Sequence, residues 1–176
     1  QIPIAMKYDV FISYSRKDTA TADQICAAFD KVGISYFIDR QGIGGGFEFP
    51  DILAEAILDS QLILFLASKN AYESKYINAE LTFAFNEKPK NTILPYIIDG
   101  SQLPNSMKLI CSSMNWRVKS EHPIEPVLVD DVLAMLGREK VVAKREQERV
   151  EQEQTIKQQR LEEEREARER LARAAE

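Results

Sequence analysis

Short apolar segments of the kind that form buried strands alternate with helix-like segments through the first 136 residues of the chain. The apolar segments are continuous rather than alternating, which is typical of strands that are covered on both faces. Strands that alternate with helices form right-handed βαβ units around a parallel sheet. The pattern therefore predicts an α/β fold with a flavodoxin-like, doubly wound, five-stranded parallel sheet. The expected strands are residues 8–13, 35–39, 62–67, 92–98 and 115–118.

Four helices are expected between and after these strands. One begins at Pro50, because the first turn of a helix tolerates a residue without an N–H group. Another begins near Asn70, which together with Glu73 resembles a capping box, and runs to about residue 85. The other two expected helices cover residues 18–32 and 126–136.

The last 40 residues, 137–176, differ sharply in composition from the rest of the chain. They carry 11 basic and 11 acidic side chains, so the net charge of −5 belongs wholly to residues 1–136. Glutamate and arginine recur there at i,i+4 spacing, which stabilises a helix. We therefore expect a folded domain over residues 7–136 and a charged C-terminal helix over residues 137–176. That tail is either a solvated single helix or linker, or a weak coiled coil that pairs with a partner.

Composition argues against several classes of function. The acidic balance argues against nucleic acid, whose binding needs a basic surface. Cys26 and Cys111 are too few for a disulfide scaffold, and the single histidine, His122, excludes a multi-histidine metal centre. The longest apolar run, residues 62–67, is far too short to span a membrane. We expect a cytoplasmic protein without a metal site.

A glycine-rich stretch, residues 42–46, follows the second expected strand. It does not match the dinucleotide-binding pattern GxGxxG, because Phe47 occupies the last position and because that pattern follows a first strand. The stretch is either a flexible connection or, between its apolar neighbours Phe47 and Phe49, a mobile loop that acts as a lid or an assembly surface.

Ligands of doubly wound sheets bind beyond the carboxyl ends of the strands, and this identifies the loops to search. Asp39 and Asp99 end the second and fourth expected strands, where we expect turn or cap residues. Tyr76 and Glu80, spaced i,i+4, share one face of the helix beyond the third strand. A carboxylate beside an aromatic ring suits a cationic or hydroxyl-rich ligand, and a solvated helix face is the alternative. Arg16 and Lys17, after the first strand, suit a phosphate, and a solvated loop pair is the alternative.

Three motifs in the right order resemble the TIR domain family. Residues 8–15 (YDVFISYS) are similar to its first box, an aromatic residue, Asp, an apolar pair and then Ile-Ser-Tyr. Residues 39–57, with the glycine-rich stretch, resemble the family's BB loop and second helix. Residues 68–81 are similar to the end of the third strand and the helix that follows it. The resemblance covers residues 7–136, so it implies a TIR domain there.

The resemblance implies a choice between TIR enzymes that cleave NAD+ and TIR adaptors that bind only other TIR domains. Glu80 stands where the enzymes carry the essential glutamate of Trp-x-x-x-Glu, and Tyr76 replaces the tryptophan but keeps a stacking surface. Tyr14 and Ser15 correspond to the loop near the nicotinamide end, and Asp39 to the opposite wall. The residues expected to bind the substrate NAD+, with no cofactor, are Tyr14, Ser15, Arg16, Asp39, Gly44, Phe47, Ser68 and Tyr76.

The function implied by the resemblance is that of an NAD+ glycohydrolase with Glu80 as its catalytic residue. Such an enzyme releases nicotinamide and leaves ADP-ribose or a cyclic isomer. The family also implies self-association through the glycine-rich loop. This loop lacks the Pro-Gly pair of animal receptor TIR domains, which favours a bacterial origin and a role in bacterial immunity or as a secreted effector. The alternative is a non-enzymatic TIR–TIR scaffold.

Overall fold

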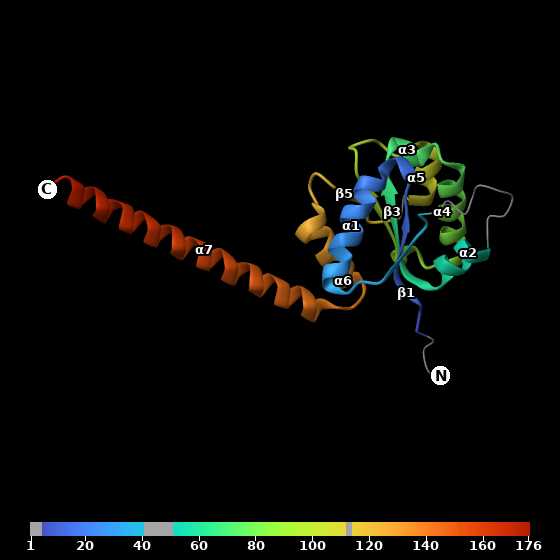
Figure 1. Ribbon diagram of the computed structural model, residues 1–176. Helices are drawn as coiled ribbons and strands as arrows, with labels where there is room; N and C mark the ends of the chain where they lie inside the picture. The colour runs from blue at the N-terminus through green and yellow to red at the C-terminus, as the bar shows by residue number, and fades with distance from the viewer. Residues whose placement is uncertain (1–4, 41–50, 112–113) are drawn as a thin grey trace. The chain divides into compact units, whose positions relative to one another are not determined.

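The computed structural model describes residues 5–40, 51–111 and 114–176. Its centre is a five-stranded sheet in the order β2-β1-β3-β4-β5, in which every neighbouring pair is parallel (Figure 1). The sequence-based prediction of a flavodoxin-like α/β fold is therefore confirmed. The strands are β1 (Tyr8–Ser13), β2 (Tyr36–Ile38), β3 (Ser60–Ala67), β4 (Ile93–Ile97) and β5 (Arg117–Val118).

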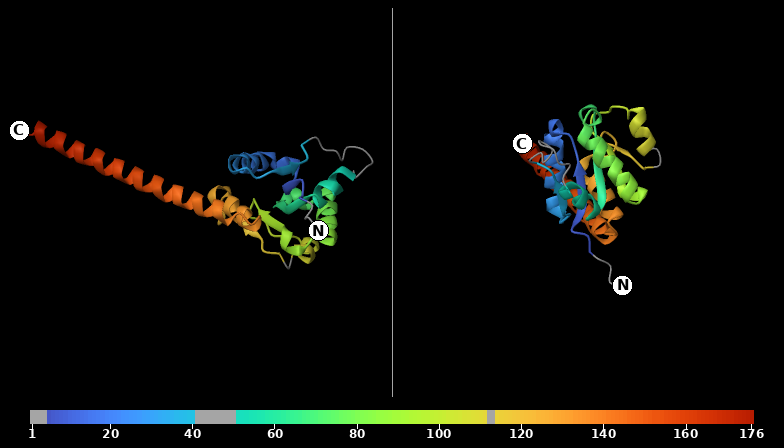
Figure 2. Two further views of the ribbon diagram at one scale, coloured as in Figure 1. Left: turned by 90° about the horizontal axis from the view of Figure 1, so that it is seen from below. Right: turned by 90° about the vertical axis from the view of Figure 1, so that its right-hand side faces the viewer.

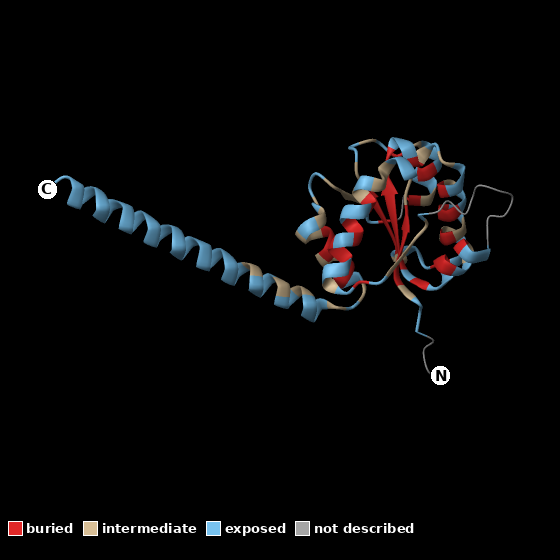
Figure 3. Cartoon of the chain, in the orientation of Figure 1, coloured by how far each residue is buried: buried red, intermediate tan, exposed pale blue. Residues whose placement is uncertain are grey.

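Helices cover both faces of the sheet, as the apolar strands require (Figures 1 and 2). On one face, Phe11, Ile63 and Phe65 pack in a continuous apolar cluster with residues of the covering helices. The three central strands, β1, β3 and β4, are accordingly buried almost throughout, whereas the edge strands β2 and β5 are half-buried (Figure 3). That face is covered by α2 (Asp51–Leu58), α4 (Lys75–Glu87) and α5 (Asn105–Cys111), and the other by α1 (Thr19–Val32) and α6 (Val129–Met135).

Helix α1 shows how the local sequence produces this packing. Its buried residues, among them Ala22, Ile25 and Phe29, recur at helical spacing and face the sheet. Gly33 ends the helix with a φ of 72°, a left-handed conformation that glycine adopts at little cost. Its N–H group donates to the carbonyl oxygens of Asp30 and Phe29, which have no partner further along the helix. The chain then turns directly into β2.

The segment after β3 differs from the prediction of one helix capped by Asn70. It forms two helices, α3 (Lys69–Tyr72) and α4, and a serine caps each of them. Ser68 Oγ accepts a hydrogen bond from the Ala71 N–H at 3.0 Å, and Ser74 Oγ accepts one from the Ile77 N–H at 3.4 Å. Because both serines satisfy amides that a helix start leaves without partners, each begins its own helix. Asn70 lies inside α3.

Two further elements depart from the pattern-based expectation. Helix α5 lies in a segment where no helix was predicted, because seven residues are too few to show a clear helical period. The expected last helix, residues 126–136, divides into a π-helical turn, η3 (Ile124–Leu128), and α6. Two single 3-10 turns, η1 (Arg16–Asp18) and η2 (Lys90–Thr92), precede α1 and β4.

The charged C-terminal segment forms one helix of 36 residues, α7 (Glu139–Ala174). The chain divides into two compact units between Gly137 and Arg138. Side chains along α7 are almost all exposed (Figure 3), and ion pairs at i,i+4 spacing run along it, including Arg170–Glu166 at 3.3 Å. Among the described residues, no helix combines the length and the apolar character needed to cross a membrane.

Candidate functional site

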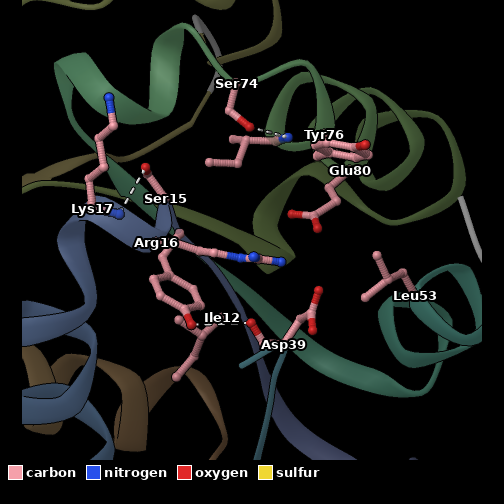
Figure 4. A pocket seen from close by; sticks show the side chains of 11 residues that line it. Ile12, Ser15, Arg16, Lys17, Asp39, Leu53, Ser74, Tyr76 and Glu80 are labelled. Atoms are coloured by element: carbon pink, nitrogen blue, oxygen red, sulfur yellow. Dashed lines mark hydrogen bonds between the residues drawn. The ribbon is translucent and has the colours of Figure 1, made fainter. Parts of the chain in front are cut away.

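A cavity of about 470 Å³ opens at the carboxyl ends of β1 and β2, beside the first turns of α4 (Figure 4). Its volume lies within the range of small-molecule sites, about 300–1,000 Å³. The cavity brings together six of the residues proposed from the sequence: Tyr14, Ser15, Arg16, Asp39, Tyr76 and Glu80. The full lining consists of Ile12, Tyr14, Ser15, Arg16, Lys17, Asp39, Leu53, Ser74, Tyr76, Ile77 and Glu80.

Glu80 is the buried carboxyl group of this cavity, with 9% of its surface exposed. Burial raises its pKa to about 7, because the charged form loses its hydration. The Ser13 hydroxyl donates a hydrogen bond to Glu80 Oε2 at 2.7 Å and opposes that rise, while the nearby negative charge of Asp39 adds to it. The side chain therefore changes its charge near neutral pH.

Tyr76 lies one helical turn before Glu80 and forms the outer part of the same wall. The Ser74 cap sets the start of α4 and so fixes which residues of its first two turns face the cavity. Tyr76 has 53% of its surface exposed, whereas Glu80 is buried beneath it. Figure 4 shows the tyrosine ring at the rim, close to the Glu80 carboxyl group. The i,i+4 spacing thus places an accessible aromatic ring beside a buried acid.

The opposite side of the cavity comes from the segment after β1. Tyr14 donates a hydrogen bond from its hydroxyl to the Asp39 carbonyl oxygen at 3.1 Å, which connects the ends of β1 and β2. Burial raises the pKa of Tyr14, so this hydroxyl remains a donor. Arg16 is exposed, and its guanidinium points into the cavity from the side opposite α4 (Figure 4). The carboxyl groups of Asp39 and Glu80 also point into the cavity, each from its own side.

One described residue proposed from the sequence does not join this group. Ser68 is not among the residues that line the cavity; it is buried, caps α3, and donates a hydrogen bond to Asp18 Oδ2 at 2.5 Å. Gly44 and Phe47 lie outside the described residues, as does the rest of the glycine-rich stretch.

Asp99 acts as the expected turn residue, since it accepts hydrogen bonds from the Lys69 and Ser101 N–H groups.

Ser13 is a residue that sequence reasoning missed. It ends a strand in which the preceding four residues are all buried, and it is itself 1% exposed. A buried hydroxyl needs a hydrogen-bond partner, so a serine at the carboxyl end of a buried strand indicates a polar group across from it. The sequence therefore indicates that Ser13 has a polar partner, but it does not identify that partner as Glu80, 67 residues away.

The arrangement suits a ligand with hydroxyl groups near Glu80, a flat ring against Tyr76, and negative charge near Arg16 and Lys17. A carboxyl group that ionises near neutral pH can accept hydrogen bonds from hydroxyls and stabilise a developing positive charge. In the described residues, no group of three or more His, Cys, Asp or Glu side chains is placed to hold a metal ion.

Comparison with known proteins identifies relatives of this fold. The family described as TIR domain matches residues 10–125. The crystal structure of the TIR domain of the Toll-related receptor TRR-2 from Hydra magnipapillata superposes with a TM-score of 0.60 at 17% identity, covering 74% of this chain and 98% of that one. A TIR-STING receptor from C. gigas, solved with 2',3'-cGAMP, has a TM-score of 0.56 at 17% identity, covering 77% and 41%. No curated protein matches the chain.

Proposed function

Because this chain belongs to the TIR domain family, we propose that it is an NAD+ glycohydrolase of the bacterial NAD-cleaving type, with Glu80 as its catalytic residue. The observation that carries the proposal is the Glu80 carboxyl group, buried in the wall of a cavity that also holds Tyr76 and Arg16. A non-enzymatic scaffold has no need of a desolvated acid, whose burial opposes its ionisation.

The proposed reaction breaks the bond between the nicotinamide nitrogen and the ribose. The bond electrons leave with nicotinamide, which departs as a neutral molecule, so no general acid is required. Positive charge develops on the ribose, as in glycoside cleavage, and the Glu80 carboxylate stabilises it while holding the ribose hydroxyls. Water then forms the new bond to the ribose and loses a proton to the solvent, giving ADP-ribose, or a nucleophilic atom of the adenosine part closes the ring of a cyclic isomer.

The other cavity residues take supporting roles in this proposal. Tyr76 offers its exposed ring for stacking, and Tyr14 and Ser15 lie across the cavity from it. Arg16 meets the pyrophosphate, since a guanidinium binds phosphate oxygens in pairs. Asp39 contributes negative charge that favours the positively charged nicotinamide ring of the substrate. Ser68 serves the site by positioning rather than by contact with the substrate.

The two compact units have separate roles in the proposal. Residues 7–136, as the TIR domain, carry the site, and the tail of residues 137–176 acts as a linker or pairs with a partner helix. Ile52 and Leu58, on α2, which follows the glycine-rich stretch in the sequence, are exposed apolar side chains. They favour contact with another protein surface, and we propose that it is a second copy of this domain. A purely scaffolding TIR domain is the alternative function that these exposed residues support.

The proposal is tested by incubating concentrated protein with NAD+ and following nicotinamide by chromatography and mass spectrometry, which also identifies the product. Glu80→Gln keeps the shape of the side chain but removes the charge, so we expect nicotinamide release to fall about 10²–10³-fold. Glu87→Gln, on the same helix but exposed and outside the cavity, is the matched control and should retain full activity. Equal rates in the wild type and Glu80→Gln would refute the catalytic role.

A further inference from the structure

Asp18 connects two segments that lie 50 residues apart in the sequence. Its Oδ2 accepts a hydrogen bond from Ser68 Oγ at 2.5 Å, and its Oδ1 accepts one from Asn70 Nδ2 at 3.0 Å. The carboxylate therefore uses both oxygens to join η1, after β1, to the start of α3, after β3. Asp18 does not itself line the cavity.

The segment that Asp18 ends supplies one whole side of the cavity. Tyr14, Ser15, Arg16 and Lys17 all belong to the lining. The 3-10 turn is closed internally, because the Asp18 N–H donates to the Ser15 carbonyl oxygen at 2.8 Å and the Lys17 N–H donates to Ser15 Oγ at 3.4 Å. Those bonds shape the turn but do not attach it to α3. The Asp18 carboxylate makes that attachment.

The other end of this attachment is rigid. Ser68 has 1% of its surface exposed and, while donating to Asp18, accepts the Ala71 N–H as the cap of α3. Asp99, beyond β4, holds the neighbouring Lys69 N–H at 2.9 Å. The start of α3 is thus fixed from two directions, so a group bonded to it is fixed relative to the sheet.

We propose that Asp18 is a positioning residue of the NAD+ site, which holds the segment of residues 14–17 so that Arg16 faces Glu80 across the cavity. The inference rests on the proposed function for its substrate. Because Arg16 and Lys17 are exposed, the packing of their own side chains does not fix them, and the anchored backbone must do so. Preorganised sites depend on such supporting hydrogen bonds, and displacements near 1 Å lower their efficiency.

The test compares Asp18→Ala with Asp9→Ala, a matched variant at the other end of β1. Asp9 also joins separate segments, since its carboxylate accepts from the Ser35 N–H at 2.9 Å and from Gln61 Nε2 at 3.4 Å, but it lies outside the cavity lining. For Asp18→Ala we expect the KM for NAD+ to rise about tenfold while kcat changes less than threefold, as for lost ground-state binding. Asp9→Ala should leave KM within twofold of the wild type.

Two further variants should give a smaller rise in the KM for NAD+ than Asp18→Ala. Asp18→Asn keeps one acceptor oxygen, so its KM should lie between those of the wild type and Asp18→Ala. Asn70→Ala removes the bond to Asp18 Oδ1 but leaves the Ser68 cap of α3 in place, so it should give a similarly intermediate KM. The same order should appear in the Kd for NAD+ measured by calorimetry in the inactive Glu80→Gln background. A KM in Asp18→Ala that stays within twofold of the wild type, or that rises equally in Asp9→Ala, overturns the inference.

A second readout needs no NAD+ at all. Hydrogen–deuterium exchange of the peptide covering residues 14–19 should be faster in Asp18→Ala than in the wild type and in Asp9→Ala. Unchanged exchange would overturn the positioning role. If the wild-type protein releases no nicotinamide, the proposed function fails, and the exchange result still decides whether Asp18 holds this segment. If it does release nicotinamide and KM is insensitive to Asp18, only the positioning role fails.

Discussion

The two ends of the parallel sheet both bury polar side chains, but they satisfy them differently. At the amino end, the Lys88 ammonium group donates to the Ser60 carbonyl oxygen at 2.5 Å, and Ser60 Oγ donates to the Ala56 carbonyl oxygen at 2.6 Å. At the carboxyl end, Glu80 is paired with another side chain, Ser13, and faces a cavity. Lys88 and Ser60 thus donate to main-chain oxygens, whereas the Glu80 carboxyl group is held by a side chain and remains open to a ligand.

On the proposed function, this difference makes one end a source of stability and the other the place of the reaction. A buried polar group that is hydrogen-bonded to the main chain contributes to the stability of the fold, and a substitution there leaves its partner unsatisfied. Burial of a carboxyl group beside a cavity disfavours its ionisation and so lowers the stability of the folded protein at neutral pH. Such a loss of stability is typical of functional sites. Substitutions at the amino end are therefore expected to change stability alone, whereas those at the carboxyl end change NAD+ turnover and, through the buried Glu80, the pH dependence of stability.

The largest effect on stability is expected for Glu80→Gln at alkaline pH. The pKa of Glu80 is raised from 4.5 to about 7 in the folded protein, so the folded state holds the proton more tightly than the unfolded state. The resulting stability is fully present below pH 4.5 and is lost as pH rises through 7, by up to about 3 kcal/mol. Glu80→Gln should abolish this loss. Urea unfolding of both proteins at pH 5 and pH 8 measures it, and parallel pH dependences would contradict the prediction.

Lys88→Met, at the amino end, should do the reverse. It keeps the apolar stem but leaves the buried Ser60 carbonyl oxygen without its donor, which should lower the free energy of unfolding by about 1–2 kcal/mol. Nicotinamide release should stay within twofold of the wild type, since Lys88 lies outside the cavity lining. A loss of turnover at preserved stability would show that the two ends are not separate in this way.

Ser13→Ala should change the pH dependence of turnover. The Ser13 hydroxyl stabilises the Glu80 carboxylate, so its loss raises the pKa of Glu80 further. A hydrogen bond of about 1 kcal/mol corresponds to slightly less than one pH unit. The acidic limb of kcat/KM for nicotinamide release should move to higher pH by about that amount. An unmoved limb would mean that this bond does not act on the reacting carboxyl group.

The smallest effect is expected in α7, which belongs to the second compact unit. Leu161→Ser changes a side chain with 57% of its surface exposed, so unfolding should change by less than about 0.5 kcal/mol. Sedimentation velocity should also be unchanged if the helix is solvated alone. A smaller sedimenting species in the variant than in the wild type would show instead that α7 pairs with another helix through this face.

Patterns along the chain predicted the fold because its strands are buried on both faces and its helices carry regular apolar stripes. Spacing alone also placed Tyr76 beside Glu80, since i,i+4 neighbours share a helix face. The break between α3 and α4 was missed, because Ser68 and Ser74 outweigh the capping-box pattern of Asn70. Local patterns contain no information about which distant side chains will meet.

The site depends on such distant meetings. Ser13 reaches Glu80 across 67 residues, and Ser68 reaches Asp18 across 50, because parallel strands bring the ends of β1 and β3 to one edge of the sheet. Ser68 was expected to contact the substrate because residues 68–81 resemble the end of the third strand and the following helix of TIR domains. The strand end is right, but the side chain is oriented toward Asp18 and the α3 amides rather than toward the cavity.

The claim that the carboxyl end of the sheet is an NAD+ site built on Glu80 is tested most directly by titrating that carboxyl group. Carbon-13 NMR of the Glu80 side chain follows its ionisation in the free protein and with carba-NAD+, whose nicotinamide bond cannot be cleaved. The midpoint should lie at about pH 7 in the free protein and fall when the ligand brings its positively charged nicotinamide ring close. A midpoint that carba-NAD+ leaves unchanged at saturating concentration would contradict the assignment.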